Sequence, residues 1–168
     1  MFVNTLDVLP QQEELKTPDD LRRWLVDRGL LERGAKVTPQ DFRRALEVRE
    51  ALRHLLAANV NGGADAGALR ALNGAAERAE LIVRFDRNGR AELNPCARGV
   101  DAAIGRILSA AYAAMINGTW QRLKACSDDR CVWAFYDQSK NRSSRWCSMA
   151  VCGNRHKARK HRQTKTAP

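Results

Sequence analysis

The stretch CSDDRCVWAFYDQSKNRSSRWCSMAVCGNR, residues 126–155, holds four of the five cysteines of the chain. Their spacing is symmetric, with four residues inside each pair of cysteines and fifteen residues between the two pairs. Two short loops that each carry two thiols can place four sulfur atoms around one ion, as structural zinc sites do. The pattern therefore predicts one Zn²⁺ held by Cys126, Cys131, Cys147 and Cys152.

Two other uses of clustered thiols compete with zinc. A pair of disulfides needs an oxidising compartment, and the opening residues MFVN lack the charged and apolar regions of a secretion signal. An iron–sulfur cluster also accepts four thiolates. Zinc is favoured because a module of about 40 residues rarely buries enough apolar surface to fold without a metal. Four sulfur ligands would leave no position for a water molecule, so we expect a structural ion and no hydrolysis.

The net charge of +10 is concentrated in the C-terminal part of the 168-residue chain. Residues 121–168 hold 12 Lys and Arg against 3 Asp and Glu, whereas residues 1–120 hold 17 against 16. This division predicts two domains, 1–120 and 121–168, and a polyanion as the partner of the second, with nucleic acid favoured over an anionic membrane surface. No run of 18 apolar residues occurs, so we expect a cytoplasmic protein without a membrane partner.

Residues 1–120 carry mainly helical signals, so we expect a mainly α fold. The segments TPDD (17–20) and TPQD (38–41) repeat one start signal, in which threonine caps a helix that begins with proline. Apolar stripes predict that these helices end near Gly29 and Asn59. A shorter helix through Leu69 and Leu72, a small β-hairpin turning at 88–89, and a helix over about 100–116 follow. The last helix should face inward with Ile104, Ile107, Leu108, Ala111 and Met115.

The N-terminal part offers no catalytic constellation. His54 has no carboxylate or cysteine at the spacing of a catalytic pair, and Cys96 stands alone after Asn94-Pro95. We therefore expect no catalytic residues and no enzyme.

The C-terminal module should fold as a hairpin followed by a helix, a treble-clef-like finger. Residues 132–136 are predicted to form a strand, 138–144 a polar turn, and 145–146 the returning strand. The aromatic side chains of Trp133, Phe135 and Trp146 could stack on bases, but in so small a module they are favoured as its core, with Tyr136 outside. The basic segment after Cys152 is either a disordered tail or, when zinc anchors it, a short helix.

The turn and the helix hold the candidate nucleic-acid contacts. Guanidinium and ammonium groups bind phosphates, and guanidinium groups also bind guanine edges. The candidates are Lys140, Asn141, Arg142 and Arg145 in the turn, and Asn154, Arg155, Lys157, Arg159, Lys160 and Arg162 in the helix.

These residues resemble the CGNR zinc-finger family, named for its last ligand and the next three residues, here CGNR at 152–155. The similarity extends to Trp133 and to residues 135–137, 139–141, 145–149 and 157–158. The resemblance implies zinc ligation by the four clustered cysteines. Members usually carry a helical domain called ABATE, which residues 2–7 and 21–24 resemble at its opening. Ser144 stands where the family commonly has arginine.

The resemblance further implies a bacterial, stress-responsive transcription regulator, with a helical domain that senses a small-molecule effector or a metal. Together with the charge, it favours a zinc-dependent DNA-binding regulator. RNA binding, and a structural or protein-interaction zinc module with an acidic partner, stay open as alternatives. One finger covers few base pairs, so useful specificity needs an extra contact or a homodimer, formed through residues 1–120.

Overall fold

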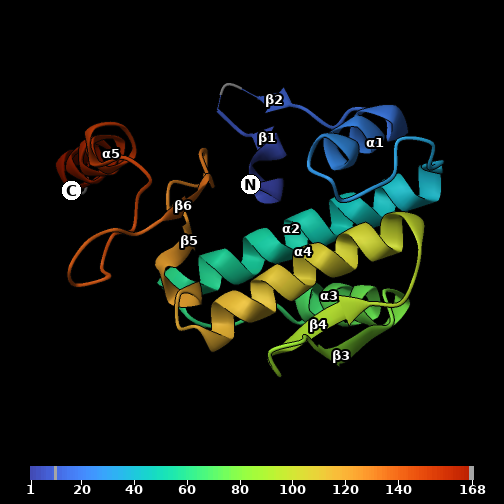
Figure 1. Ribbon diagram of the computed structural model, residues 1–168. Helices are drawn as coiled ribbons and strands as arrows, with labels where there is room; N and C mark the ends of the chain where they lie inside the picture. Colours follow the sequence, from blue (N-terminus) through green and yellow to red (C-terminus); the bar gives the residue numbers. More distant parts are fainter. Residues whose placement is uncertain (10, 167–168) are drawn as a thin grey trace.

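The computed structural model describes residues 1–9 and 11–166. Two helices, α2 (Pro39–Asn61) and α4 (Gly99–Ile116), run side by side through the N-terminal part (Figure 1). Helix α1 (Pro18–Asp27) contacts α2, and α3 (Ala66–Arg78) contacts both α2 and α4. The short elements are η1 (Phe2–Thr5), β1 (Leu6–Asp7), β2 (Gln12–Glu13), β3 (Leu81–Phe85), β4 (Ala91–Pro95) and η2 (Trp120–Arg122). The predicted mainly α class with a small hairpin is confirmed.

Both predicted helix starts are present as complete capping boxes. Thr17 and Thr38 each accept a hydrogen bond from the backbone N–H three residues later, and the carboxylates of Asp20 and Asp41 each accept one from the backbone N–H of the threonine. Helix α1 ends just before Gly29, whose φ of 65° suits glycine. Helix α2 runs two residues past the predicted Asn59 and stops at Gly62.

The core between these helices is continuous with the start of the C-terminal part. Leu21, Leu25 and Val48 are almost fully buried, and the same cluster includes Ala125 and Ala134 from the finger. The buried residues of α4 all lie in its first two turns. The prediction that Met115 faces inward is therefore wrong: its exposed fraction is 43 %. By length and composition α4 could cross a membrane, but here it packs against α2, α3 and β4.

Directional hydrogen bonds fix the finger to the helical part. The Asn4 side chain donates to the Ala134 carbonyl (2.9 Å) and accepts from its N–H (2.8 Å), as a neighbouring strand would. From α2, the buried Arg53 guanidinium donates to the carbonyls of Val3 (2.7 Å) and Val132 (2.9 Å). Further along α2, the amide of Asn59 donates to two more carbonyls, those of Trp120 and Leu123. The two parts therefore form one structural unit.

Replacing Arg53 tests this connection. We expect Arg53→Leu to lower the free energy of unfolding by about 3 kcal/mol, because it leaves buried carbonyls without donors. Urea denaturation of the zinc-loaded chain measures the change. The control is Arg23→Ala, which removes an exposed arginine paired with Asp19 and Asp20 on α1 and should change stability by less than about 0.5 kcal/mol. Equal effects of the two substitutions would contradict a role for Arg53 in joining the parts.

Candidate metal centre

The four cysteines sit at the two places where a treble-clef-like finger needs them. Cys126 directly follows β5 (Leu123–Ala125), and Cys131 lies in the loop before β6 (Ala134–Tyr136). Cys147 precedes η3 (Met149–Gly153), a single wide helical turn that contains Cys152 and leads into α5 (Asn154–Thr166). One pair is therefore held by a hairpin loop and the other by the start of a helix.

The hairpin differs from the predicted one. Strand β6 pairs antiparallel with β5, with Ala125 opposite Ala134, and residues 145–146 are no part of the pair. Residues 137–144 do not form a tight turn, because Lys124 on β5 binds them, as described below. The backbone of Arg145 instead accepts a hydrogen bond at its carbonyl from Ser127 N–H (2.8 Å). The predicted strand over 132–136 is also shorter, because Val132 has a φ of 45°.

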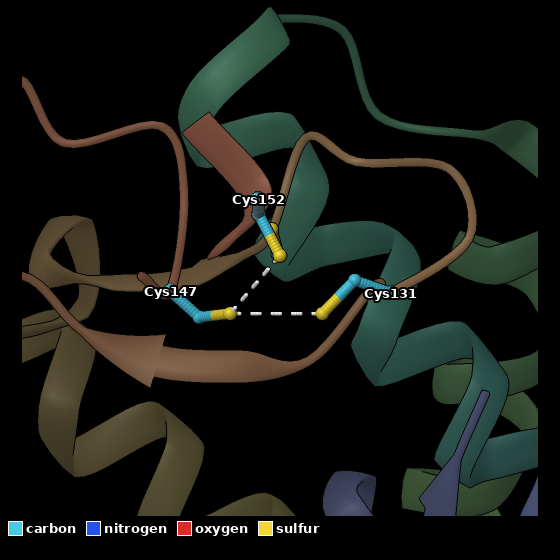
Figure 2. Close-up of side chains that lie close together, drawn as sticks. Cys131, Cys147 and Cys152 are labelled. Carbon is cyan, nitrogen blue, oxygen red and sulfur yellow. Dashed lines mark hydrogen bonds between the residues drawn. The ribbon is translucent and has the colours of Figure 1, made fainter. Parts of the chain in front are cut away.

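The cysteine sulfur atoms have the separations that a tetrahedral zinc site requires. Cys147 Sγ lies 3.6 Å from Cys131 Sγ and 3.8 Å from Cys152 Sγ (Figure 2), and all four Sγ atoms lie within 4.8 Å of one another. Four sulfurs at about 2.3 Å from one Zn²⁺ would be about 3.8 Å apart. The donor set and its geometry therefore fit a closed structural zinc site.

The protein surroundings alone disfavour thiolates at these positions. Burial raises the pKa of Cys147 well above its ordinary value, and the neighbouring Cys131 raises it further. Burial also raises the pKa of Cys152 to about 12, again with help from the Cys131 thiol. A cation must therefore provide the free energy for deprotonation, which links metal binding to proton release. Arg155 lines the shallow hollow beside Cys131, Cys147 and Cys152 and adds positive charge there.

The loop between Cys126 and Cys131 is held in an unusual backbone conformation. The Asp128 carbonyl accepts hydrogen bonds from the N–H groups of Cys131 (2.8 Å) and Val132 (3.1 Å). Val132 occupies the left-handed region, which is strained for a β-branched residue. Its carbonyl accepts from Arg53, so a helix of the N-terminal part holds the strained residue next to a zinc ligand.

A buried aspartate in the same loop anchors α5. The Asp128 carboxylate is fully buried and forms an ion pair with Arg159 (2.9 Å). Its second oxygen has no hydrogen bond among the described residues but lies 3.9 Å from Arg155. Arg159 also binds Asp129 (2.9 Å), and this hydrogen bond lowers the pKa of the Asp129 carboxyl. The first two arginines of the basic helix therefore face the zinc loop.

A second buried ion pair fixes the predicted polar turn. Lys124 Nζ donates to Asp137 Oδ2 (2.7 Å) and to the carbonyls of Arg142 (2.5 Å) and Ser144 (3.1 Å). Burial alone would raise the pKa of Asp137, but hydrogen bonds from Lys124, Ser139 and Ser144 outweigh it and hold the pKa far below its ordinary value. Sequence reasoning missed this pair. Lys124 lies on a three-residue strand with no visible alternation, and its partner is brought close only by folding.

The predicted nucleic-acid contacts fall into two groups. Arg155 and Arg159 are half-buried and face Asp128, Arg145 donates to Asn61 (3.0 Å), and the Asn154 amide donates to the Ala150 carbonyl (3.0 Å). Arg145 and Asn154 are nevertheless exposed, as are the other candidates, namely Lys140, Asn141, Arg142, Lys157, Lys160 and Arg162, and Arg162 Nε donates to the Ala158 carbonyl (3.3 Å).

The aromatic side chains of the finger form its small core. Trp133, Phe135 and Trp146 pack against the buried cysteines, as the sequence favoured, and the Trp146 ring lies 5.4 Å from that of His156. Tyr136 is 46 % exposed, which confirms its predicted place outside. The basic segment after Cys152 is helical over its described residues.

Comparison with known proteins agrees with this geometry. The family model ABATE, described as "Putative stress-induced transcription regulator", matches residues 1–118, and the CGNR zinc finger matches residues 122–165. No curated protein matches the chain. The zinc-finger match and the sulfur cluster together assign one Zn²⁺ to Cys126, Cys131, Cys147 and Cys152.

Zinc affinity should depend strongly on pH. Because zinc displaces protons from thiols whose pKa burial has raised, we expect the affinity to fall about tenfold or more for each unit as pH drops from 8 to 6. Competition with a chromophoric chelator of known pH dependence measures this. Cys96→Ser, which changes the one cysteine outside the cluster, should leave the profile unchanged. An affinity independent of pH would contradict thiolate ligation.

Removing Lys124 should destabilise the finger without removing its ligands. We expect Lys124→Met to cost about 3 kcal/mol in the free energy of unfolding, because it leaves the buried Asp137 charge unpaired. The double variant Lys124→Met/Asp137→Leu should recover part of this loss, since neither charge is then buried alone. Thermal denaturation of the zinc-loaded proteins, with zinc content measured in parallel, gives both values. No recovery in the double variant would argue against the ion pair.

Proposed function

The chain belongs to the ABATE family and carries its CGNR zinc finger, and on this basis we propose a zinc-dependent, DNA-binding transcription regulator of the bacterial cytoplasm. The observation that carries the proposal is the charge of the finger, 12 Lys and Arg against 3 Asp and Glu in residues 121–168. The three acids are Asp128, Asp129 and Asp137, and each one is paired with a cation inside the finger. The field outside the finger is therefore strongly positive, as a polyanion partner needs.

We assign the contact surface to the exposed cations and not to the whole basic segment. Lys157, Lys160 and Arg162 on α5, with Lys140 and Arg142 on the loop, are exposed. Arg155 and Arg159 orient α5 through Asp128 and act as positioning residues. A helix of 13 residues spans about 20 Å, long enough to lie in a major groove.

Duplex DNA fits this surface better than single-stranded RNA. Single-strand recognition relies on aromatic side chains that stack on unpaired bases. Trp133, Phe135 and Trp146 are occupied in the finger core, which leaves Tyr136 as the exposed ring of this segment. An acidic protein partner could use the same cations and is the alternative that the experiment below separates.

We also propose that the protein has no catalytic role. His54 is exposed on α2 and Cys96 is exposed after β4, and neither lies in the metal cluster. A zinc ion held by four sulfur atoms has no position for a reacting water molecule. We include in the proposal a small-molecule effector of the helical domain, as a partner that a transcription regulator could sense.

Charge reversal on α5 tests DNA binding. Zinc-loaded protein should retain a subset of genomic fragments at physiological salt, and Lys157→Glu/Lys160→Glu should weaken duplex binding about tenfold or more while the zinc content stays unchanged. Fluorescence anisotropy measures affinity and its salt dependence. Lys36→Glu/Arg43→Glu, an equal charge change on exposed residues of the helical part, should have a much smaller effect.

The positioning role of Arg159 gives a different result in the same assay. Arg159→Glu should weaken binding and also lower the melting temperature, because it places a second negative charge against Asp128. Unchanged duplex affinity in both α5 variants would contradict the proposal. If single-stranded RNA competes better than duplex DNA, RNA binding is favoured. If the protein captures an acidic protein and nuclease treatment does not release it, the protein-interaction alternative is favoured.

A further inference from the structure

The hollow on the surface of the finger opens directly onto the metal centre. Its volume is about 280 Å³, and three of the four clustered cysteines line it, namely Cys131, Cys147 and Cys152. The rest of the lining combines apolar side chains with charged and polar ones, namely Leu9, Trp133 and Val151 with Asp7, Ser148 and Arg155. A molecule of liquid water occupies about 30 Å³, so the hollow has room for a small molecule beside the sulfur atoms.

The four cysteines differ in how far solvent reaches them. Cys126, Cys131 and Cys152 are buried, with exposed fractions of 3 %, 8 % and 2 %. Cys147 is only half-buried. Cys126 is also not among the residues that line the hollow. Because the susceptibility of a thiolate to oxidation follows its exposure, Cys147 is the ligand that a dissolved oxidant meets first.

The Cys147 sulfur has two sulfur atoms close to it. Figure 2 shows Cys147 between the other two cysteines of the hollow, with its Sγ 3.6 Å from Cys131 Sγ and 3.8 Å from Cys152 Sγ. A disulfide bond is about 2 Å long, so a small movement of the side chains brings either pair into bonding distance. Cys131 is the closer of the two and comes from the other cysteine pair. A bond between Cys131 and Cys147 therefore removes one metal ligand from each pair.

A cation faces the same hollow. Arg155 lines it, and 40 % of the arginine side chain is exposed. Its nearest Asp128 oxygen is 3.9 Å away, which is too long for a hydrogen bond. When a peroxide bond breaks, the departing oxygen carries negative charge, and a guanidinium group stabilises such an oxygen by a charge-assisted hydrogen bond. The hollow therefore combines an accessible sulfur nucleophile with a cation that favours the departure of an oxygen.

We propose that Cys147 is a site of oxidation by hydrogen peroxide, with Cys131 as the sulfur that completes a disulfide. Cys147 Sγ attacks one peroxide oxygen and the O–O bond breaks, so the sulfur becomes a sulfenic acid and the other oxygen leaves as hydroxide. Cys131 Sγ then attacks Cys147 Sγ, the S–O bond breaks, and a second hydroxide leaves. Protons from solvent convert both hydroxides to water. One peroxide is thereby reduced to two waters while two thiolates are oxidised to one disulfide.

The oxidation takes apart the metal centre. Only Cys126 and Cys152 remain as ligands, and two sulfur atoms do not make the closed four-ligand set of a structural zinc site, so the ion is released. Helix α5 then loses the metal that fixes its start, and its described residues lose the support that binding of the ion gives to folding. The inference rests on the zinc site and not on DNA binding, because both steps take place between residues of the finger.

Zinc release and disulfide mapping test the proposal on the zinc-loaded full chain. We expect hydrogen peroxide to release one Zn²⁺ per chain, recorded with a chromophoric chelator. Alkylation at low conversion, followed by peptide mass spectrometry, should find a disulfide between Cys131 and Cys147. Reduction with added zinc should restore the original metal content. Cys96→Ser changes an exposed cysteine outside the cluster and should leave the rate of release unchanged.

Two matched ligand exchanges distinguish oxidation at Cys147 from oxidation of any sulfur in the cluster. Three cysteines and one histidine also form a structural zinc set, so Cys147→His and Cys126→His both keep four ligands. We expect Cys147→His to release zinc about tenfold more slowly than Cys126→His, because the most accessible sulfur is gone. Val151→Trp keeps all four cysteines and enlarges an exposed side chain of the hollow, so it should also slow release.

Three results would overturn the proposal. They are a wild-type chain that keeps its zinc in excess peroxide, equal release rates in the two histidine variants, and a first disulfide that lacks Cys147 or joins it to Cys152. If a histidine variant does not bind zinc, the wild-type disulfide map and the rate of Val151→Trp decide, since neither needs a change of ligand. An unchanged rate in Val151→Trp would then contradict attack through the hollow.

Discussion

Four thiols within 4.8 Å of one another can become thiolates only if a cation lies among them, and the rest of the finger depends on that cation. The ligands come from a hairpin loop and from the turn that leads into a helix, so the metal joins these two elements at the small core of the finger. Once the second pair is bound, Cys152 starts α5 at a defined place. The metal site thus nucleates a helix in the basic segment, which is too short to form a stable helix by itself.

The zinc loop is also supported from outside the finger. Arg53 on α2 binds the carbonyl of the strained Val132, and Asn4 binds both polar backbone groups of Ala134. These bonds reach across more than seventy residues of sequence, so they form only when both parts are folded. A change of conformation in the helical part that moved Arg53 would therefore break the hydrogen bond to Val132, the residue next to Cys131. This bond connects the helical part to the zinc site.

Local signals predicted what depends on local chemistry. The two capping boxes, the cysteine spacing and the outward Tyr136 follow from residues close in sequence, and all are present. The pairing of β6 with residues 123–125 was missed because these residues show no hairpin turn signal in the sequence. The two strands meet only when the loop that holds Cys126 and Cys131 is folded. Met115 was placed inward because periodicity defines a helix face but does not tell how far the neighbouring helices cover it.

The greatest difference between composition and structure lies in the cations of the finger. Composition treats all basic residues after Cys152 alike, but the fold uses Arg155 and Arg159 to hold α5 against Asp128. Lys124 likewise has a structural role, because its ammonium group donates hydrogen bonds to carbonyls of the loop that carries Lys140 and Arg142. Three buried or paired acids therefore bind part of the positive charge within the finger, and they hold the loop and the helix that carry the remaining cations. A preorganised set of charges loses less conformational entropy on binding than a flexible basic tail would. The acids of the finger would therefore favour the proposed binding of a polyanion, although their own negative charge repels it.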